Sequence, residues 1–432
     1  MSTTLPLPIP WVRPAIDPAL LHRLTRPSDL LGWLQAGGYL LTAVATGAAT
    51  LAAAASGAWG WTALSLFVHG TVCSFMINAV HELVHGTVFR SRWTNRLFLE
   101  GFSIIGWISH RVFWASHARH HQSTLHPPHD REVVLPIRLS FRDFLREAVF
   151  SPWHMWWTIR GTIRLAAGRP GGRWEEETLT DRSARQAARI AAAATLATHA
   201  IIAGIAFGQG WWLLPVVTSL TPLYGRGLHW LLNSTQHVGM QANVPDFRLN
   251  TRSIRIDPVC SFLYWRMQHH IEHHLYAGVP CYRLAELHRA LGAQLPSPPD
   301  LVGAWAEIIA TLHRQRSDPS WCVVPTWKDP APAAEPPPAS ALVAGSATMT
   351  LTAAAAIESA ATTTPDLATA RLRWRCQVCG FVYDEAAGLP EDGIAPGTAW
   401  SAIPDDWLCP ECGIDKTRFV MEQIEAETPH SV

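Results

Sequence analysis

Two long apolar runs without a charged side chain constrain the fold of this chain most strongly. They cover residues 30–55 and 57–80. Each is long enough to cross a hydrocarbon layer of about 30 Å as a helix, since a helical residue adds about 1.5 Å. The joint between them also lacks charge, so we expect a tight helical hairpin. Residues 187–207 and 211–232 predict a second hairpin, which makes four membrane-spanning helices in all.

The composition agrees with an integral membrane protein of more than one domain. Of the 432 residues, 48% are hydrophobic and only 16% are charged, and the 21 tryptophans suit aromatic belts at a membrane interface. The formal net charge is zero, which gives no support for a nucleic-acid partner. The proline-rich start has no basic region before a short apolar core, so we expect no cleavable signal peptide.

The distribution of arginine predicts the orientation in the membrane. Arginines are concentrated between the two hairpins, whereas both hairpin tips lack lysine and arginine. The positive-inside rule therefore places both termini, and the histidine clusters described below, in the cytoplasm. We expect the membrane to be the inner membrane of a bacterium.

Three shorter segments have other patterns. Residues 97–109 are apolar but too short to span easily, and predict a buried or re-entrant segment. Residues 141–167 mix arginines with phenylalanine and tryptophan, which predicts a helix lying in the membrane interface. Residues 284–314 predict a helix in the soluble part.

Three clusters of histidine, and one isolated histidine, lie beside the apolar runs on the predicted cytoplasmic side. Within each cluster the spacing of three and four residues puts the rings on one face of a helix. Imidazole is a good ligand for iron, copper and zinc, and nine rings are too many for one ion and about right for two. The nine candidate ligands are His81, His85, His117, His120, His121, His237, His270, His273 and His274.

Two kinds of zinc site are the alternatives to a di-metal centre for these residues. A structural zinc site usually takes four ligands and prefers cysteine, which these segments lack. The pattern from His81 through Glu82 to His85 also matches the helix of a zinc hydrolase. That interpretation leaves the other two histidine clusters without a purpose.

The cluster patterns are His-x3-His, His-x2-His-His and Gln-x-His-Ile-Glu-His-His-Leu-Tyr, the last at residues 268–276. They resemble the three histidine boxes of the membrane fatty acid desaturase and hydroxylase superfamily, over residues 30–292. The resemblance implies an all-α integral membrane domain with four transmembrane helices, a cytoplasmic di-iron centre and O2-dependent attack on an unactivated C–H bond. By position the nine histidines correspond to that family's iron ligands, whereas His269 occupies a non-ligand position.

Residues near the boxes have less certain roles. Glu82 and Glu272 lie inside boxes and either orient ligand rings or are solvated helix residues. Asp130 could brace the loop after the second box. Asn233 could hold a metal-bound water, but we expect it to cap or pack.

Four of the eight cysteines form two Cys-x-x-Cys-Gly motifs near the C-terminus, and the other four are scattered. This is not the pattern of a disulfide framework and suits a reducing compartment. The four clustered thiolates, Cys376, Cys379, Cys409 and Cys412, predict a tetrahedral sulfur site for zinc or iron.

The segment between the two cysteine motifs favours iron over zinc, because it resembles a known iron-binding family. It contains Tyr383-Asp384, Gly393-Ile394-Ala395-Pro396-Gly397-Thr398, Trp400 and Pro404-Asp405-Asp406-Trp407. This pattern is similar to rubredoxin along its whole length. The resemblance implies a small β-rich domain in which the four cysteines hold one iron that carries a single electron. Tyr383, Trp400 and Trp407 would form its core, and a zinc-loaded structural version is the alternative.

The chain is therefore predicted to consist of five parts. These are an N-terminal arm (1–29), the membrane domain (30–325), a flexible Pro/Ala/Thr linker (326–370), the rubredoxin-like domain (371–424) and a tail (425–432). A flexible linker of this length spans several tens of Å and would keep the carrier near the membrane domain at high effective concentration.

The two resemblances together predict a membrane-bound di-iron oxygenase. Reductive activation of O2 takes two electrons, so a one-electron carrier must deliver twice and be re-reduced by an NAD(P)H-dependent flavoprotein rubredoxin reductase. The preferred reaction is desaturation or hydroxylation of an acyl or alkyl chain of a lipid. Oxidation or dealkylation of a small polar metabolite, or of a carotenoid or alkane, stays open. The remote alternative is a membrane electron-transfer protein without substrate turnover.

Overall fold

A computed structural model describes residues 9–135, 137, 139–169, 179, 181–327, 372–405, 407–416 and 421–424. All but the first two residues of the predicted linker, and the whole predicted tail, lie outside the described residues. The boundaries of the five predicted parts therefore stay predictions.

Three helical stretches within the described residues are long and apolar enough to cross a membrane. They are Asp29–Ala55, Trp59–Val84 and Arg182–Gln209. They correspond to three of the four predicted spans. The first joins α2 (Asp29–Gly32), the π-helical turn η1 (Trp33–Gly37) and α3 (Gly38–Ala55); the second joins α4 (Trp59–Ser74) and α5 (Met76–Val84); the third is α11 (Arg182–Gln209).

The first hairpin closes as predicted, because small residues let α3 and α4 approach closely. A Cβ on Gly47 would lie 3.2 Å from the ring of His69 on α4. The His69 ring is fully engaged, with Thr46 Oγ1 2.9 Å from Nδ1 and the carbonyl of Val217 2.8 Å from Nε2. This buried histidine thus connects the hairpin to the segment that follows α11.

The fourth predicted span, residues 211–232, is not a continuous helix, and four spans are not confirmed. The segment contains α12 (Leu213–Thr218), the 3-10 turn η2 (Thr221–Leu223) and the start of α13 (Gly227–Asn233). Pro222 lacks the N–H group that a continuing helix needs, and Gly225 has a positive φ of 74°. A Cβ on Gly225 would lie 2.5 Å from the backbone nitrogen of Thr71, so the chain crosses directly against α4.

The predicted interfacial segment consists of two helices, α8 (Phe141–Ala148) and α9 (Pro152–Ala166), and not one. A β-bridge between Phe150 and Tyr224 interrupts them. Trp153, Trp156 and Trp157 are exposed on α9, as expected for an aromatic face toward a membrane interface. Residues 97–109, predicted to be re-entrant, lie largely in the amphipathic helix α6 (Arg92–Ile105), which α7 (His110–Ser123) follows.

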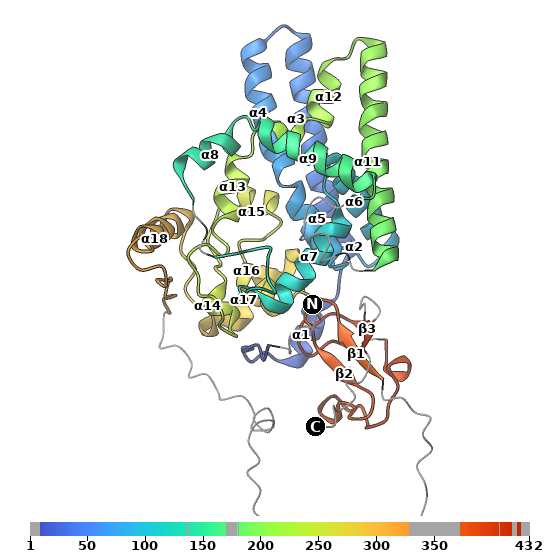
Figure 1. Cartoon of the computed structure of the whole chain (residues 1–432), viewed down its shortest axis with the longest axis vertical. Helices are drawn as coiled ribbons and strands as arrows, with labels where there is room; N and C mark the ends of the chain where they lie inside the picture. The colour runs from blue at the N-terminus through green and yellow to red at the C-terminus, as the bar shows by residue number, and fades with distance from the viewer. Residues whose placement is uncertain are drawn as a thin grey trace, which may run out of the picture.

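The remaining helices lie toward the end of the molecule opposite the hairpin tips (Figure 1). The predicted helix 284–314 is broken by Gly292, which has a positive φ of 50°. In the N-terminal arm, Trp11 is buried and stacks on Phe247 with ring centroids 4.0 Å apart, so the arm packs on the rest of the protein. The helices at the end opposite the hairpin tips are α1 (Pro18–Thr25), α14 (Phe247–Asn250), α15 (Pro258–Leu263), α16 (His270–Leu275), α17 (Leu284–Leu291) and α18 (Leu301–Arg314).

The C-terminal part is a three-stranded antiparallel sheet in the order β2-β1-β3. Its strands are β1 (Arg373–Cys376), β2 (Val382–Asp384) and β3 (Met421–Ile424). Tyr383 and Trp407 are buried in its core, and Trp400 packs between them with ring centroids 5.9 and 5.7 Å away. Figure 1 places this sheet beside α1 and below α7, at the end remote from the hairpin tips.

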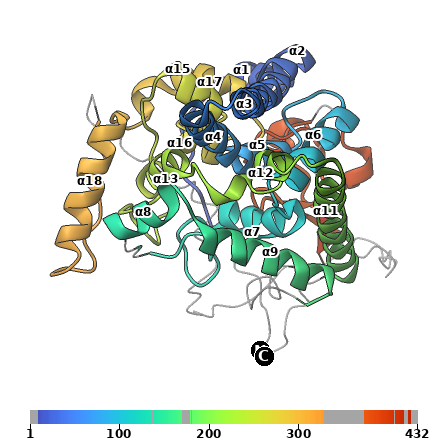
Figure 2. The same ribbon diagram turned by 90° about the horizontal axis from the view of Figure 1, so that it is seen from above.

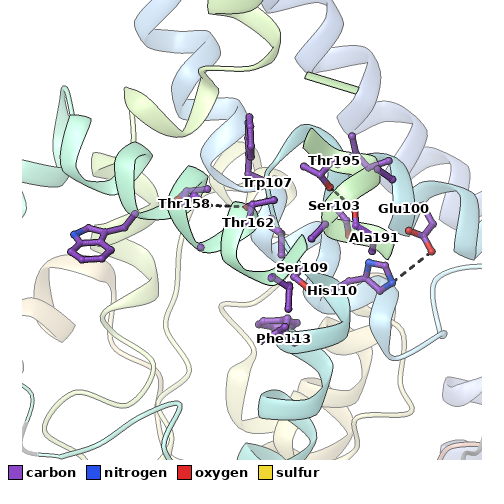
Figure 3. A pocket seen from close by; sticks show the side chains of 18 residues that line it. Glu100, Ser103, Trp107, Ser109, His110, Phe113, Thr158, Thr162, Ala191 and Thr195 are labelled. Carbon is purple, nitrogen blue, oxygen red and sulfur yellow. Dashed lines mark hydrogen bonds and ion pairs between the residues drawn. The ribbon is translucent and has the colours of Figure 1, made fainter. Parts of the chain in front are cut away.

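A cavity of about 360 Å³ lies between α6, α7, α9 and α11 (Figure 3). Seen from above, α7 and α9 lie beside α11 (Figure 2). Hydroxyl groups of Ser103, Thr158, Thr162 and Thr195 line it together with apolar side chains. Phe113 closes one wall.

Candidate metal centre

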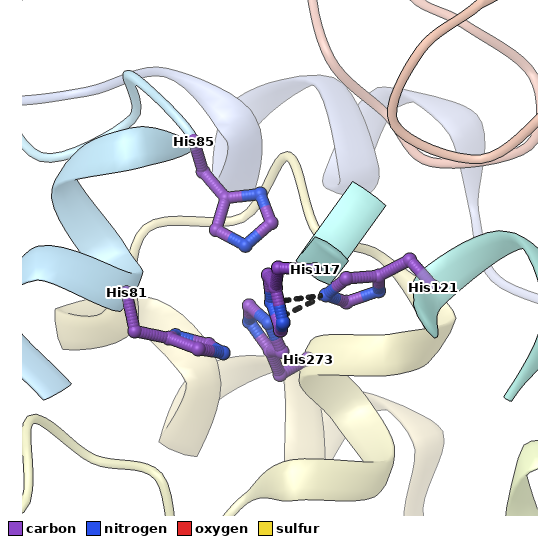
Figure 4. Close-up of side chains that lie close together, drawn as sticks. All are labelled: His81, His85, His117, His121 and His273. Carbon is purple, nitrogen blue, oxygen red and sulfur yellow. Dashed lines mark hydrogen bonds between the residues drawn. The ribbon is translucent and has the colours of Figure 1, made fainter. Parts of the chain in front are cut away.

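Five of the nine predicted histidines converge at one point (Figure 4). Each offers a ring nitrogen, and these five atoms all lie within 4.8 Å of one another. The Nε2 atom of His121 is 3.0 Å from Nε2 of His117 and 3.1 Å from Nε2 of His273. This five-histidine cluster is formed by His81 and His85 at the end of α5, His117 and His121 on α7, and His273 on α16.

The other four histidines form a second buried cluster, whose ligand atoms meet the same 4.8 Å criterion. Its members are His120, His237, His270 and His274. The Nε2 atom of His270 lies 3.1 Å from that of His237 and 3.2 Å from that of His274. The rings of His121 and His274 stack with centroids 4.4 Å apart, so this four-histidine cluster directly adjoins the first.

The helical spacing decides which cluster each ring enters. On α7, His117 and His121 are four residues apart and share the five-histidine cluster, whereas His120 enters the other. On α16 the residues four apart share the four-histidine cluster, and His273 enters the other. One short helix therefore supplies both clusters, because residues three and four apart project at different angles around its axis.

Hydrogen bonds at Nδ1 fix the orientation of several of these rings. An acceptor at Nδ1 holds the proton there and leaves the lone pair on Nε2, which is the form that binds a metal. The pairs are His81 with Glu82 (3.0 Å), His117 with Glu132 (3.1 Å), His120 with Asp130 (2.9 Å) and His237 with the carbonyl of Asn250 (3.0 Å).

The resulting arrangement fits metal ions and little else. Lone pairs on Nε2 atoms about 3 Å apart repel one another unless a cation lies between them. Both ring nitrogens of His85, and Nε2 of His81, are buried without a hydrogen-bond partner among the described residues. Burial lowers the pKa of His117 and His121 well below the usual range, with a further contribution from neighbouring imidazoles, so both rings are neutral and able to coordinate.

Asp130 braces the loop after α7, as the sequence suggested. Its carboxylate accepts hydrogen bonds from the backbone of Leu125 (2.8 Å) and Glu132 (2.9 Å) as well as from His120. Burial alone would lower the pKa of His120, but the Asp130 carboxylate outweighs it and raises that pKa. Burial likewise acts to raise the pKa of Asp130, and the pairing with His120 lowers it. Asp130 therefore stays a carboxylate and accepts the Nδ1 proton of His120, which leaves Nε2 of that ring free to coordinate a metal.

The two glutamates inside the boxes have different surroundings. Glu82 bonds a candidate ligand, whereas Glu272 faces away from both clusters toward His269 and His288. Glu272 also accepts a 2.7 Å hydrogen bond from the Ser253 hydroxyl. Burial acts to raise the pKa of Glu272, but the hydrogen bonds and charges of His269 and His288 outweigh it and lower that pKa to about 2. It thus anchors α16 from outside both clusters, whereas Asn233 is exposed.

Several of these supporting residues have no recognisable signature in the sequence. Glu132 and Ser253 come from loops, and Asn250 and His288 from the helices α14 and α17, at no characteristic spacing from the boxes. Only their positions in the folded chain identify them.

The four cysteines of the C-terminal sheet also converge, with all four sulfur atoms within 4.8 Å of one another. Sγ of Cys379 is 3.5 Å from Sγ of Cys409, and Sγ of Cys376 accepts a hydrogen bond from the backbone of Val378 at 3.3 Å. Burial raises the pKa of the Cys409 thiol well above its usual range. A bound cation reverses that effect and stabilises the thiolates, so this site also fits a metal.

Comparison with known proteins identifies both parts of the chain. The fatty acid desaturase family model matches residues 56–302, more than half of the chain, and the rubredoxin model matches residues 373–419. The C-terminal part is 60% identical to Rubredoxin-1 of Alcanivorax borkumensis over 52 residues, which are 12% of this chain and 96% of that protein. It is 58% identical to the rubredoxin of Acinetobacter baylyi over 52 residues, again 12% of this chain and 96% of that protein.

A rubredoxin segment also occurs within larger proteins. The chain is 47% identical over 70 residues, 16% of its length, to the anaerobic nitric oxide reductase flavorubredoxin of Escherichia coli, of which the match covers 14%. The four-cysteine cluster accordingly belongs to a one-iron rubredoxin domain, and the two histidine clusters agree with a di-iron centre. The chain is an oxidoreductase with helices suited to a membrane, and it belongs to the fatty acid desaturase family, with a rubredoxin domain fused at its C-terminal side.

Proposed function

We propose that this protein is an O2-dependent di-iron oxygenase that desaturates or hydroxylates an acyl or alkyl chain. In this proposal the nine histidines hold two irons, the four cysteines hold a third, and the rubredoxin domain supplies electrons one at a time. The observation that carries the proposal is the pair of adjoining, buried histidine clusters with their Nε2 atoms facing inward.

The bound irons would supply the reductive activation of O2, and the chain supplies the geometry. Glu132 and Asp130 hold the proton on Nδ1 of His117 and His120, so each ring presents Nε2 to its cluster. Burial of all nine rings excludes water from the reaction. Desaturation returns both oxygen atoms as water, whereas hydroxylation leaves one in the product, and both take two electrons from the carrier for each O2.

The cavity between α6, α7, α9 and α11 is the candidate substrate site. Its wall residue Phe113 stacks on His117 with ring centroids 5.0 Å apart and an angle of 14° between the planes. A chain lying in the cavity would therefore be separated from the five-histidine cluster by one aromatic ring. The exposed aromatic face of α9 gives a membrane-embedded chain a route to this side of the protein.

The same cavity motivates a second candidate, oxidation of a compact polar metabolite. Hydroxyl groups of Ser103, Thr158 and Thr195 line it. Glu100 and His110 add two further polar side chains, which lie 3.6 Å apart. Polar groups of this kind orient a ligand that carries hydrogen-bonding atoms, whereas an alkyl chain has none.

The remaining partners follow from the carrier. A one-electron rubredoxin needs a reductase, for which we propose an NAD(P)H-dependent flavoprotein. Because the rubredoxin domain lies at the end opposite the uncharged hairpin tips, we propose that this end faces the cytoplasm of a bacterium and that the membrane is the inner one.

The proposal is tested by product analysis in cells that express the chain with a rubredoxin reductase under heavy-isotope O2. Lipid and polar extracts are compared by mass spectrometry for the wild type, His120→Ala and His129→Ala. His129 is an exposed histidine of the loop after α7 and serves as the matched control. We expect product in the wild type and the control and none in His120→Ala.

Each product identifies a reaction. A lipid that gains one heavy oxygen indicates hydroxylation, and a lipid that loses two hydrogens without label indicates desaturation. Oxidation of a polar metabolite with no change in the lipids would favour the second candidate function over a lipid substrate. Oxygen uptake that does not differ between the wild type and His120→Ala, with no product in either extract, would contradict an oxygenase.

A further inference from the structure

The rubredoxin domain does not stand apart from the membrane domain but lies against it (Figure 1). Three places in the membrane domain contact its cysteine motifs: the loop after α16, the helix α7 and the N-terminal arm. None of these contacts involves the sheet face remote from the cysteines, among the contacts that the described residues make. The question is what this particular orientation achieves.

The loop after α16 makes the closest approach. The backbone N–H of Gly278 donates a 2.8 Å hydrogen bond to the carbonyl of Cys412. A Cβ on Gly278 would lie 2.5 Å from backbone atoms of both Gly413 and Ile414. The neighbouring Ala277 is only 2% exposed and packs in the same apolar cluster as the cysteines. Gly278 needs no positive φ, so its small size serves this contact and not its own backbone.

Helix α7 contacts both metal sites at once. Trp114 packs in the apolar cluster of the rubredoxin domain, and on its other side its ring meets that of His85 edge to face, with centroids 5.5 Å apart. About two helical turns further along α7, the side chain of Gln122 donates a 2.8 Å hydrogen bond to the carbonyl of Gln377. Trp114 therefore lies between the four cysteines and the five-histidine cluster.

The arm closes the third side of the contact. Arg13 Nε bonds the Glu411 carboxylate at 2.9 Å, and Thr25 lies 3.0 Å from the position of a Cβ on Gly413. Arg13 is largely buried, and its guanidinium also lies over the rings of Phe247 and Tyr276 at 5.7 Å. The charge on the rubredoxin side thus meets a fixed, oppositely charged partner.

We propose that this orientation is the electron-delivering complex, and that electrons enter the di-iron centre at the five-histidine cluster through Trp114 and His85. The inference rests on the proposed function and identifies where electrons enter the di-iron centre. In each delivery the rubredoxin iron goes from ferrous to ferric, and one ferric ion of the histidine centre becomes ferrous. Two deliveries supply the two electrons that one O2 requires, and the external reductase restores the rubredoxin iron each time.

The docked surface is tested first without turnover, by hydrogen exchange of the full metal-loaded chain in detergent. The wild type is compared with Gly278→Ala and with Gly101→Ala, a control because a Cβ there meets nothing within 4 Å. We expect Gly278→Ala to increase exchange in residues 276–280 and 376–380, with no change for the control, because the hydrogen-bonded amides become accessible. Unchanged exchange in Gly278→Ala would show that the domain is not docked in solution.

Glu411→Arg is a second docking variant on the rubredoxin side, where the side chain is 38% exposed and its replacement does not endanger the membrane domain. It places a positive charge against Arg13, so we expect the same increase in exchange. Protection that survives both substitutions would overturn the docking surface.

The entry point is tested by the rate at which the reduced rubredoxin iron is reoxidised on mixing with O2, followed by its visible absorbance. We expect Gly278→Ala to slow this step by on the order of tenfold or more, since an undocked carrier loses effective concentration. Trp114→Leu should slow it with exchange unchanged, whereas Trp93→Leu, at a 72% exposed tryptophan, should not. A wild-type rate in Trp114→Leu would refute entry through this residue. Absence of any oxidised product would sink the proposed function, while the exchange result would still decide the docking.

Discussion

At the residue scale, the hydrogen bond at Nδ1 determines what each histidine of the centre can do. A ring whose Nδ1 proton is fixed by a carboxylate or carbonyl presents Nε2 as a ligand and cannot rotate away. His120 shows the strongest version, because Asp130 is buried and is itself held by two backbone amides. The four-histidine cluster therefore depends on a loop that contributes no ligand of its own.

Asp130→Asn should weaken metal binding in the four-histidine cluster without unfolding the chain. The amide keeps the size of the side chain but loses the charge that fixes His120, and losing such a partner typically costs about 10- to 100-fold in metal affinity. The measurement is the iron content after dialysis against graded chelator, with Asp318→Asn at an exposed site as the control. Equal iron retention in both variants would contradict the bracing role.

Neighbouring histidines should control different irons. His273 enters the five-histidine cluster and His274 the four-histidine cluster, although they adjoin in the sequence. Each single alanine variant should therefore lose about one iron, and the double variant about two, because each removes a ligand from one cluster only. Iron per chain is measured against the visible absorbance of the rubredoxin site as an internal standard. Loss of both irons in either single variant would mean that the clusters do not bind independently.

At the element scale, hydropathy and structure disagree over residues 211–232. The segment is long and largely apolar, but it is divided into α12, η2 and α13, and the chain turns at Gly225 against α4. Hydrogen bonds to the connection between α8 and α9 satisfy backbone groups that a broken helix leaves unpaired: the N–H of Gly225 bonds the carbonyl of Val149 at 3.1 Å, and the carbonyl of Leu223 accepts from the N–H of Ser151 at 2.6 Å. Length and apolar composition cannot report such support, because it comes from other elements.

Gly225→Ala should destabilise the membrane domain. The positive φ disfavours alanine, and its Cβ would lie 2.5 Å from the backbone of Thr71, so we expect a cost on the order of 1–3 kcal/mol. Thermal unfolding of the detergent-solubilised chain measures it. Gly208→Ala, whose Cβ meets nothing within 4 Å, is the matched control and should melt like the wild type. If Gly225→Ala also melted at the wild-type temperature, the turn at residue 225 would accommodate the added Cβ, and the prediction would be wrong.

The parts that could be predicted from the sequence are those with a local signature. Eight of the nine histidines and all four cysteines stand at fixed spacings within short motifs, and the number of rings together with the resemblance indicated two ions for the histidines. The helical spacing within each motif determines which rings lie on the same face. It does not say which cluster each face meets, because that depends on how the helices pack in the folded chain. Glu132 and Asn250 had no signature at all, since only the closing of distant loops brings them to Nδ1 of His117 and His237.

At the scale of the whole molecule, the fused domain is both bound and tethered. The docked arrangement places the loop after α16 directly against Cys412, whose carbonyl accepts the hydrogen bond of Gly278, so a reductase could approach this side of the domain only after release. We propose that the predicted linker, residues 326–370, allows this release while preventing loss of the carrier. A separate domain that diffused between its partners would lose the high local concentration that the linker provides.

Separating the two parts tests what the fusion contributes. The match covers 96% of Rubredoxin-1 of Alcanivorax borkumensis, so a domain of this kind exists as a separate protein. We expect a chain that ends at residue 327, mixed with an equal micromolar amount of the separate domain, to turn over far more slowly than the intact chain. Its rate should approach the intact rate only as the added domain nears the millimolar effective concentration that a short flexible linker provides. The intact chain with the same added domain is the control and should not change. If the mixture already matched the intact chain at micromolar concentration, docking alone would suffice, and the linker would serve no kinetic purpose.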